Sequence, residues 1–205
     1  MEKIIIDSPR LFIRSANSRL DIECLLKYRN DPDYMDLCTN KKKILSFNEF
    51  LEEYYNEFTK SRHLQTMIKT KKKSEVIGTM FSYGLNLYDG YVFITIFLEK
   101  QYREKGYAPE AIVSFMDFLF KRFSLYKIYM DVYEYNKLSL HTLIKRGAMI
   151  EGVFKGHRIY RDSRHDLYRF SVYQKDIQKI YQSVISICQK FAPQKNSALT
   201  NNPIN

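Results

Sequence analysis

The chain has 205 residues, 45% of them hydrophobic, and a formal net charge of +10 at pH 7. This length suits one domain with a buried core. No apolar run is long enough to cross a membrane and the N-terminus lacks the apolar stretch of a signal peptide, so we expect a cytoplasmic protein. Cys24, Cys38 and Cys188 are odd in number and lack the spacing of metal ligands, which argues against a disulfide framework and a metal site.

The positive charge is compatible with nucleic acid, acidic membranes or acidic ligands as partners. Part of it comes from two clusters, Lys41–Lys43 and Lys71–Lys73. The second cluster lies between two strand patterns, where a solvated hairpin turn is expected. The chain has neither an Arg-rich recognition helix nor an aromatic RNA-stacking motif, so nucleic acid is not an expected partner.

The first half of the chain carries signals for both helices and strands. Pro32 is expected to end a first helix. Ser46 and Glu49 have the spacing of a capping box, so a second helix is expected to open there. Gly78 marks a bulge or a close backbone approach within a strand. The predicted elements are a strand over Leu11–Arg14, a helix over Leu20–Arg29, the helix that Ser46 caps, and strands over His63–Lys69 and Glu75–Tyr83.

The second half completes the pattern of one α/β (α+β) domain. Asp89-Gly90 is a turn signal that predicts antiparallel pairing of the strands beside it. Asn136 and Gly147 frame a short helix, as its N-cap and as the residue after its C-cap. We assign residues 1–176 to the domain, 177–191 to a C-terminal helix and 192–205 to a tail that is expected to be disordered. The predicted elements are strands over Tyr91–Leu98, Tyr126–Tyr133, Met149–Lys155 and Asp166–Tyr173, and helices over Tyr107–Arg122 and Gln174–Phe191.

The junction after Tyr91–Leu98 carries the most informative motif. The strand ends in a charged turn that reads Arg103-x-x-Gly106-x-Ala108, and a helix pattern follows directly. The free backbone N–H groups of such a loop, together with the helix N-terminus, can bind an anion. Gly106 allows the backbone to approach a phosphate closely, while Arg103 and Lys105 add positive charge. The residues alone indicate either a site for a phosphate-bearing ligand or a plain connector.

Further motifs follow this loop in order. They are Asn136-x-x-Ser139 (NKLS) after the next strand, Lys145-Arg146-Gly147-Ala148 (KRGA) at the end of a helix, and His165-Asp166-Leu167-Tyr168 (HDLY) in a late strand. From Leu11 to Asp176 the succession resembles the GNAT superfamily of acetyl-CoA-dependent N-acetyltransferases, and within it the branch of Rim-type ribosomal-protein and spermidine acetyltransferases. The resemblance implies a mixed, mostly antiparallel sheet flanked by helices, with one splayed pair of parallel strands.

The resemblance also implies where acetyl-CoA binds and which groups act on it. The cofactor would lie where Tyr91–Leu98 and Tyr126–Tyr133 part, and the backbone N–H of Leu98 would donate to the oxyanion. Many relatives place a tyrosine on the helix after N-x-x-S as the acid for the leaving thiolate, but Leu143 stands at that position here. Some relatives with the N-x-x-S pattern use its serine instead, so the resemblance implies Ser139 as the acid. The implied cofactor-binding residues are Phe97, Leu98, Arg103, Glu104, Lys105, Gly106, Tyr107, Ala108, Asn136 and Ser139.

Other polar residues are weaker candidates for catalysis. Tyr135, His141 and Thr142 lie near the expected acid, and Glu99 or Glu134 could orient a water molecule. Each has a simpler explanation as a residue of helix packing or of a solvated loop.

The acceptor is open at the level of the sequence. Glu49, Glu53 and Glu57 recur on one helix face and would suit a polyamine or a lysine-rich peptide, although a solvated face explains them more simply. Arg158 and its basic neighbours would instead suit an acidic sugar or a carboxylate. We expect an N-acetyltransferase that acts on a small-molecule amine, an amino sugar, a polyamine or a peptide N-terminus, and we consider a homodimer. The alternative is an inactive acyl-CoA-binding domain or a basic nucleic-acid or ribosome-binding module.

Overall fold

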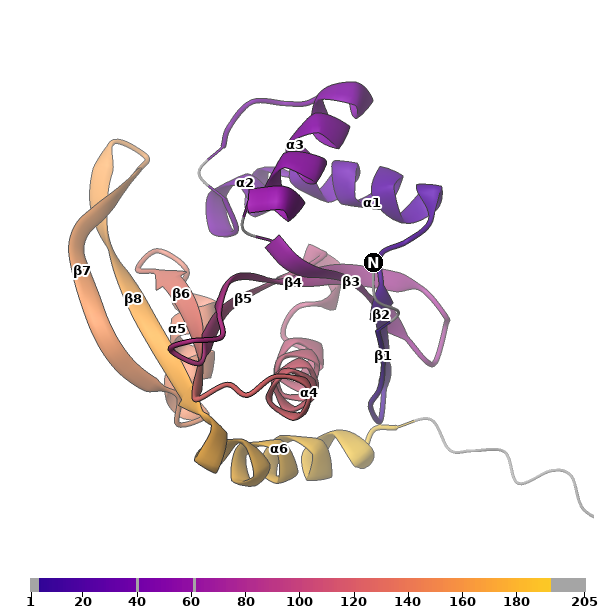
Figure 1. Cartoon of the computed structure of the whole chain (residues 1–205), viewed down its shortest axis with the longest axis vertical. Coiled ribbons are helices and arrows are strands. Elements are labelled where there is room, and N and C mark those ends of the chain that lie inside the picture. Colours follow the sequence, from indigo (N-terminus) through magenta and orange to yellow (C-terminus); the bar gives the residue numbers. More distant parts are fainter. Residues whose placement is uncertain (1–3, 40, 61, 193–205) are drawn as a thin grey trace, which may run out of the picture.

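The computed structural model describes residues 4–39, 41–60 and 62–192, so the predicted tail lies outside it from residue 193 onward. The described residues form an eight-stranded sheet with helices on both faces (Figure 1). The strands are β1 Ile5–Asp7, β2 Leu11–Ser15, β3 Arg62–Thr70, β4 Val76–Asn86, β5 Tyr91–Leu98, β6 Lys127–Tyr133, β7 Met149–Tyr160 and β8 Ser163–Tyr173. The helices are α1 Arg19–Arg29, α2 Pro32–Leu37, α3 Phe47–Lys60, α4 Tyr107–Arg122, α5 Lys137–Lys145 and α6 Gln174–Gln189, with a 3-10 turn, η1, over Lys100–Tyr102.

The sheet is mixed and mostly antiparallel, as the sequence predicts. Its order is β1-β2-β3-β4-β5-β6-β8-β7, and β5 and β6 are its parallel pair, joined by α4. Their register pairs Tyr91 with Lys127 and Phe93 with Tyr129. Beyond Phe93, β5 continues along β4 to Leu98, while β6 continues along β8 to Tyr133. The two strands therefore part at their C-terminal ends, which confirms the expected splay.

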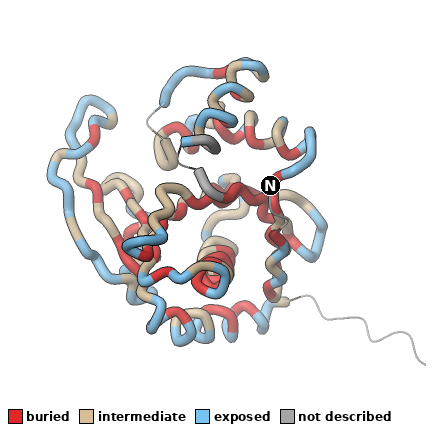
Figure 2. Tube along the Cα trace, in the orientation of Figure 1, coloured by how far each residue is buried: buried red, intermediate tan, exposed pale blue. Residues whose placement is uncertain are grey.

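Two apolar cores lie on opposite faces of this sheet. The larger core gathers around α4, which packs between the sheet and α6, and the smaller one lies under α1 and α3 (Figures 1 and 2). Side chains along β5 alternate between them, since Ile94 and Leu98 join the α4 core whereas Phe97 joins the other. β5 is thus shared by both layers, and its backbone is held from both sides.

Local chemistry explains several helix ends. Ser46 and Glu49 form the predicted capping box, because the Ser46 N–H donates to Glu49 Oε2 at 2.8 Å and the Glu49 N–H donates to Ser46 Oγ at 3.4 Å. The Asn136 side chain accepts from the N–H of Ser139 and caps α5. Gly147 follows the end of α5 with φ at +79°, the left-handed conformation that glycine tolerates best. These predictions are confirmed.

The structure also contains a helix that the sequence patterns did not predict. Pro32 does follow the end of α1, but it also occupies the first turn of α2, where its missing N–H has no partner to lose. Asp31 caps this helix, since its Oδ1 accepts from the N–H of Asp33 at 2.8 Å. The proline was interpreted only as a stop, so the short helix that it opens was missed.

The last two strands are longer than predicted. β7 runs on to Tyr160 and β8 begins at Ser163, whereas their sequence patterns indicated ends near Lys155 and Asp166. Arg161 and Asp162 both have positive φ and make the two-residue turn of a tight hairpin. The charged residues around this turn are typical of a loop, yet the backbone of the two strands stays paired up to the turn. The hairpin curls beside the face that carries α2 (Figure 1).

Candidate active site

The predicted anion loop connects the end of β5 to the start of α4. After η1 the chain passes through Glu104 and Gly106, whose φ values are 61° and 75°, and Gly106 is the N-cap of α4. The first N–H groups of a helix have no partner inside it and carry partial positive charge. The loop therefore presents backbone donors at the sheet edge where β5 and β6 part, and a phosphate group matches this donor set.

Arg103 contributes less free charge than the sequence suggests. Its Nε donates to the carbonyl of Leu98 at 2.9 Å and its Nη1 lies 2.6 Å from Asp33 Oδ2. The guanidinium therefore ties the loop to β5 and α2, and its charge is paired. Lys105, by contrast, is exposed beside the ring of Tyr102, at 5.8 Å from the ring centroid. Lys105 is the loop cation that can reach a phosphate without breaking an ion pair.

The gap between β5 and β6 is lined by backbone groups of alternate residues. Glu99 donates its N–H to the carbonyl of Ile77 on β4 at 3.0 Å. Because backbone direction alternates along a strand, the amide groups of Phe97 also face β4, whereas those of Ile96 and Leu98 face the gap. The Leu98 carbonyl is taken by Arg103. The register thus turns the amide groups of Phe97, which the resemblance implies as a cofactor-binding residue, away from the gap, and the ring of Phe97 packs against Tyr28 and Tyr34.

The N-terminus of α5 lies beyond the end of β6, near the same gap. Asn136 Oδ1 accepts from the Ser139 N–H at 3.3 Å, so the amide side chain acts as a cap. Ser139 is half-buried on the first turn. Leu143, at the position where many relatives have tyrosine, packs against the α4 core and offers no proton. Ser139 stays the candidate acid of this helix.

The weaker catalytic candidates are engaged in other contacts or face away. The Tyr135 hydroxyl donates to the carbonyl of Asp36 at 2.6 Å, and burial raises its pKa. His141 is exposed. Glu99 lies 3.1 Å from the Lys27 ammonium, and Glu134 accepts from the Asp166 N–H at 3.3 Å.

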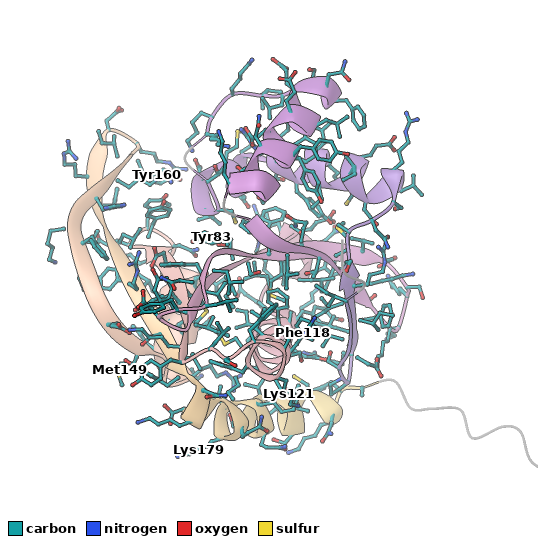
Figure 3. All side chains as sticks on the ribbon, viewed as in Figure 1. Tyr83, Phe118, Lys121, Met149, Tyr160 and Lys179 are labelled. Atoms are coloured by element: carbon teal, nitrogen blue, oxygen red, sulfur yellow. The ribbon has the colours of Figure 1, made fainter. Side chains whose placement is uncertain are left out.

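A cavity of about 320 Å³ opens on the opposite face of the sheet from α4. Its walls come from α1, α3, β3, β4 and the segment after α2, and its floor reaches Thr95 on β5 and Tyr133 on β6. These two residues lie past the last β5–β6 pair, so the cavity meets the gap from the far side. Tyr83 also lines the cavity, and burial raises the pKa of its phenol to about 12. In Figure 3, Tyr83 lies on the side of the molecule nearer to the β7–β8 hairpin.

The cavity carries balanced charge. Arg29 is buried and bonds Glu53 at 2.6 Å, while Lys41 lies 3.3 Å from Glu53 and 2.7 Å from Glu57. Burial alone would raise the pKa of Glu53, but the bonds from Arg29 and Lys41 outweigh it and lower that pKa. Glu49 does not line this cavity; its carboxylate is engaged by Lys43 and Ser46, which lower its pKa to about 2. Of the glutamates predicted to meet an acceptor, the structure brings Glu53 and Glu57 to the cavity.

Arg158 lies behind the cavity wall and is buried. Its Nη2 donates to the carbonyl of Thr39 at 2.6 Å, and its guanidinium stacks over the ring of Tyr133 at 4.4 Å. Its Nη1 is buried and has no hydrogen-bond partner in the described part of the chain. Arg158 thus fastens the β7–β8 hairpin to the segment after α2. The sequence indicates Arg158 as a cation for an acidic sugar or a carboxylate, whereas the structure engages its guanidinium within the protein.

Within residues 4–39, 41–60 and 62–192, no group of three or more His, Cys, Asp or Glu residues could hold a metal ion. No helix of the described chain is long and apolar enough to cross a membrane.

Comparison with known proteins supports the same identification. The model of the acetyltransferase (GNAT) domain matches residues 10–149. An uncharacterized N-acetyltransferase p20 of Bacillus licheniformis is 27% identical over 154 residues, covering 73% of this chain and 80% of the relative. Spermidine N-acetyltransferase of Vibrio cholerae, solved with CoA and spermine, superposes with a TM-score of 0.72 at 22% identity, covering 82% of this chain and 98% of that one.

A GCN5-related N-acetyltransferase of Brucella melitensis gives a TM-score of 0.73 at 18% identity, covering 92% of this chain and 86% of that one. At such identities the structural matches establish the fold, while the domain model spans most of the chain. The chain therefore belongs to the GNAT family of acetyltransferases, enzymes that transfer an acetyl group from acetyl-CoA to an amine.

Proposed function

We propose that the loop of residues 103–108 and the gap beside it hold acetyl-CoA. The observation that carries this proposal is that β5 and β6 stop pairing directly before a loop whose backbone donors precede a helix. The N–H groups around Gly106 suit the pyrophosphate, with Lys105 as the free cation. The Ile96 N–H, which faces the gap, suits a carbonyl of the pantetheine arm, which Asn136 meets from the other side.

Acetyl-CoA supplies the acetyl group as a thioester, and the protein supplies position and proton control. The Leu98 N–H faces the gap and is the donor for the carbonyl oxygen of the thioester. Ser139, on the first turn of α5, donates a hydrogen bond or proton to the departing sulfur. The positive end of α5 favours negative charge at that point. The incoming amine must lose a proton first, because an alkylammonium has a pKa near ~10.4.

We further propose that the acceptor enters through the cavity on the α1–α3 side. Lys41 is the more exposed of the two cations there, with 42% of its side chain accessible against 5% for Arg29. An ammonium group of the substrate can therefore replace Lys41 between Glu53 and Glu57 while Arg29 stays in place. This arrangement favours a di- or polyamine, whose second amine then reaches the gap near Thr95. The spermidine acetyltransferase neighbour supports that choice.

The test measures acetyl-CoA binding and turnover separately. Calorimetry with CoA should show binding to the wild type and loss of binding in Gly106→Val, because a β-branched residue is strained at φ +75° and its Cβ would lie 3.2 Å from Arg10 Nη2. Free-thiol release with spermidine, a hexosamine and a lysine peptide then identifies the acceptor. Unchanged CoA affinity in Gly106→Val contradicts the proposed loop. Binding without amine-dependent release would instead favour an acyl-CoA-binding protein without turnover.

A further inference from the structure

A fully buried carboxylate lies under the first turn of α4. Glu110 has no exposed surface, and its Oε1 accepts from the Ser8 hydroxyl at 2.8 Å and from the Arg10 N–H at 2.7 Å. Its Oε2 accepts from Arg10 Nε at 2.7 Å. A charged pair this deep is costly unless its hydrogen bonds are satisfied. Here both carboxylate oxygens are engaged, and the segment between β1 and β2 is fixed against α4.

The other end of Arg10 grips the anion loop. Its Nη1 donates to the carbonyl of Lys105 at 3.0 Å and its Nη2 donates to the carbonyl of Gly106 at 2.8 Å. The guanidinium also lies over the ring of Tyr107, at 4.7 Å from the ring centroid. One side chain thus holds two consecutive peptide groups of the loop, and Glu110 holds that side chain.

The geometry of the peptide unit determines the direction in which the N–H groups of the loop point. In a planar trans peptide the C=O and the next N–H point in opposite directions. Because Arg10 holds the carbonyls of Lys105 and Gly106, the N–H groups of Gly106 and Tyr107 point away from Arg10. We infer that Arg10, set by Glu110, is a positioning residue that aims these two N–H groups at the pyrophosphate of the donor. The inference rests on the proposed role of the loop.

Charge balance fits this role. Arg10 contributes no free positive charge to the loop, because Glu110 pairs with it in a buried contact. Arg10 therefore acts by orienting the N–H groups of the loop. Its loss should weaken binding of the pyrophosphate and leave binding of the acyl end of the donor unchanged. The KM for acetylpantetheine, a donor that lacks the pyrophosphate, should not change. This difference separates positioning from a general loss of stability.

The experiment compares Arg10→Met and Arg10→Lys with a matched control, Arg14→Met. Arg14 also pairs with a buried carboxylate, since its Nη1 and Nη2 each lie 2.7 Å from an oxygen of Asp21, but that pair fixes α1 and touches no part of the loop. Calorimetry gives the Kd for CoA, and initial rates give the KM for acetyl-CoA and for acetylpantetheine. Two misaligned hydrogen bonds to a charged group predict that Arg10→Met weakens CoA binding by about 10- to 100-fold. The KM for acetylpantetheine should stay within about twofold, since hydrogen bonds to the pyrophosphate are absent from that donor. Arg14→Met should bind CoA as the wild type does.

The outcomes are distinguishable. Gly106→Val that binds CoA normally overturns the loop site itself. Loss of binding in Gly106→Val with an unchanged Kd in folded Arg10→Met overturns only the positioning role, as does an equal loss with both donors. If Arg10→Met does not fold, Arg10→Lys decides. A lysine can reach one carbonyl at a time, so its Kd for CoA must rise, and a wild-type Kd would refute the inference.

Discussion

Gly78→Ala on β4 should damage the donor site although residue 78 lies outside the proposed contacts. Gly78 pairs with Leu98 across the β4–β5 ladder. A methyl group at this position would lie 2.2 Å from the Phe97 carbonyl oxygen and 2.7 Å from Leu98 Cδ2. The close backbone approach predicted for this glycine is therefore present, and it lies beside the stretch of β5 whose N–H groups face the gap.

The size of the effect follows from that distance. Ordinary van der Waals contact begins near 3.4 Å, so the strands must separate locally by about 1.2 Å. Overpacking of this kind costs about 1–3 kcal/mol, and for a chain of this size each kcal/mol lowers Tm by about 2–4 °C. A misplacement of about 1 Å at reacting groups can cost about 100-fold in rate. We expect a folded protein with a lower Tm and with kcat/KM reduced by about two orders of magnitude.

The assay compares this variant with Gly152→Ala on β7. The nearest atom to a methyl group there is Phe154 Cε2, at 4.0 Å, so Tm and kcat/KM should match the wild type. Both variants add one methyl group to a glycine in a strand, and they differ only in what that group meets. If Gly78→Ala keeps kcat/KM within about twofold, the tight β4–β5 contact does not set the geometry of the site, and the reasoning from distance to rate fails.

Ser139→Ala should lower kcat by about 10²–10⁴-fold while the calorimetric Kd for CoA holds, because only proton donation is removed; turnover within about twofold would leave Ser139 as a first-turn residue of α5 with no part in catalysis. Leu143→Tyr should raise kcat if an acid is missing on α5, and an unchanged rate in the folded variant would count against that idea. Burial would raise the pKa of Asp21, but bonds from Arg14 and nearby N–H groups lower it to about 2, so the stability it adds is present above pH ~4 and is lost as pH falls towards ~2. In Asp21→Asn the free energy of unfolding should therefore fall less between pH ~4 and pH ~2 than in the wild type, by about 1 kcal/mol after solvent screening. Unfolding followed by circular dichroism at these pH values measures the difference, and an equal fall in both proteins would contradict it.

Features that depend on neighbouring residues could be predicted from the sequence. The cap at Asn136, the left-handed glycine at Gly147 and the capping box at Ser46 all rest on bonds within a few residues. The strand–loop–helix order that indicates the donor site is local in the same sense. The resemblance to the family rests on these local motifs, and the resemblance in turn implies the mixed sheet with a splayed parallel pair.

Features that depend on distant contacts could not be predicted. Arg103 looked like a free cation, because its partner Asp33 lies on a helix that the sequence patterns missed. The burial of Arg158 could not be predicted, because it depends on how far the β7–β8 hairpin extends. The Arg10–Glu110 pair joins residues 100 positions apart, and neither residue belongs to a recognisable motif. Spacing along a sequence carries no information about such pairs.

The alternation of side chains along β5 has an evolutionary consequence. One set of its residues belongs to the layer that carries the donor loop, and the other belongs to the layer that walls the cavity. Substitutions on the inner faces of α1 and α3 therefore change the side chains that wall the cavity and leave the side chains of the α4 layer in place. If the proposed function holds, such an enzyme can come to accept a new amine through changes in the cavity layer while the sequence of its loop at residues 103–108 is kept. Libraries aimed at a different acceptor should accordingly be confined to that layer.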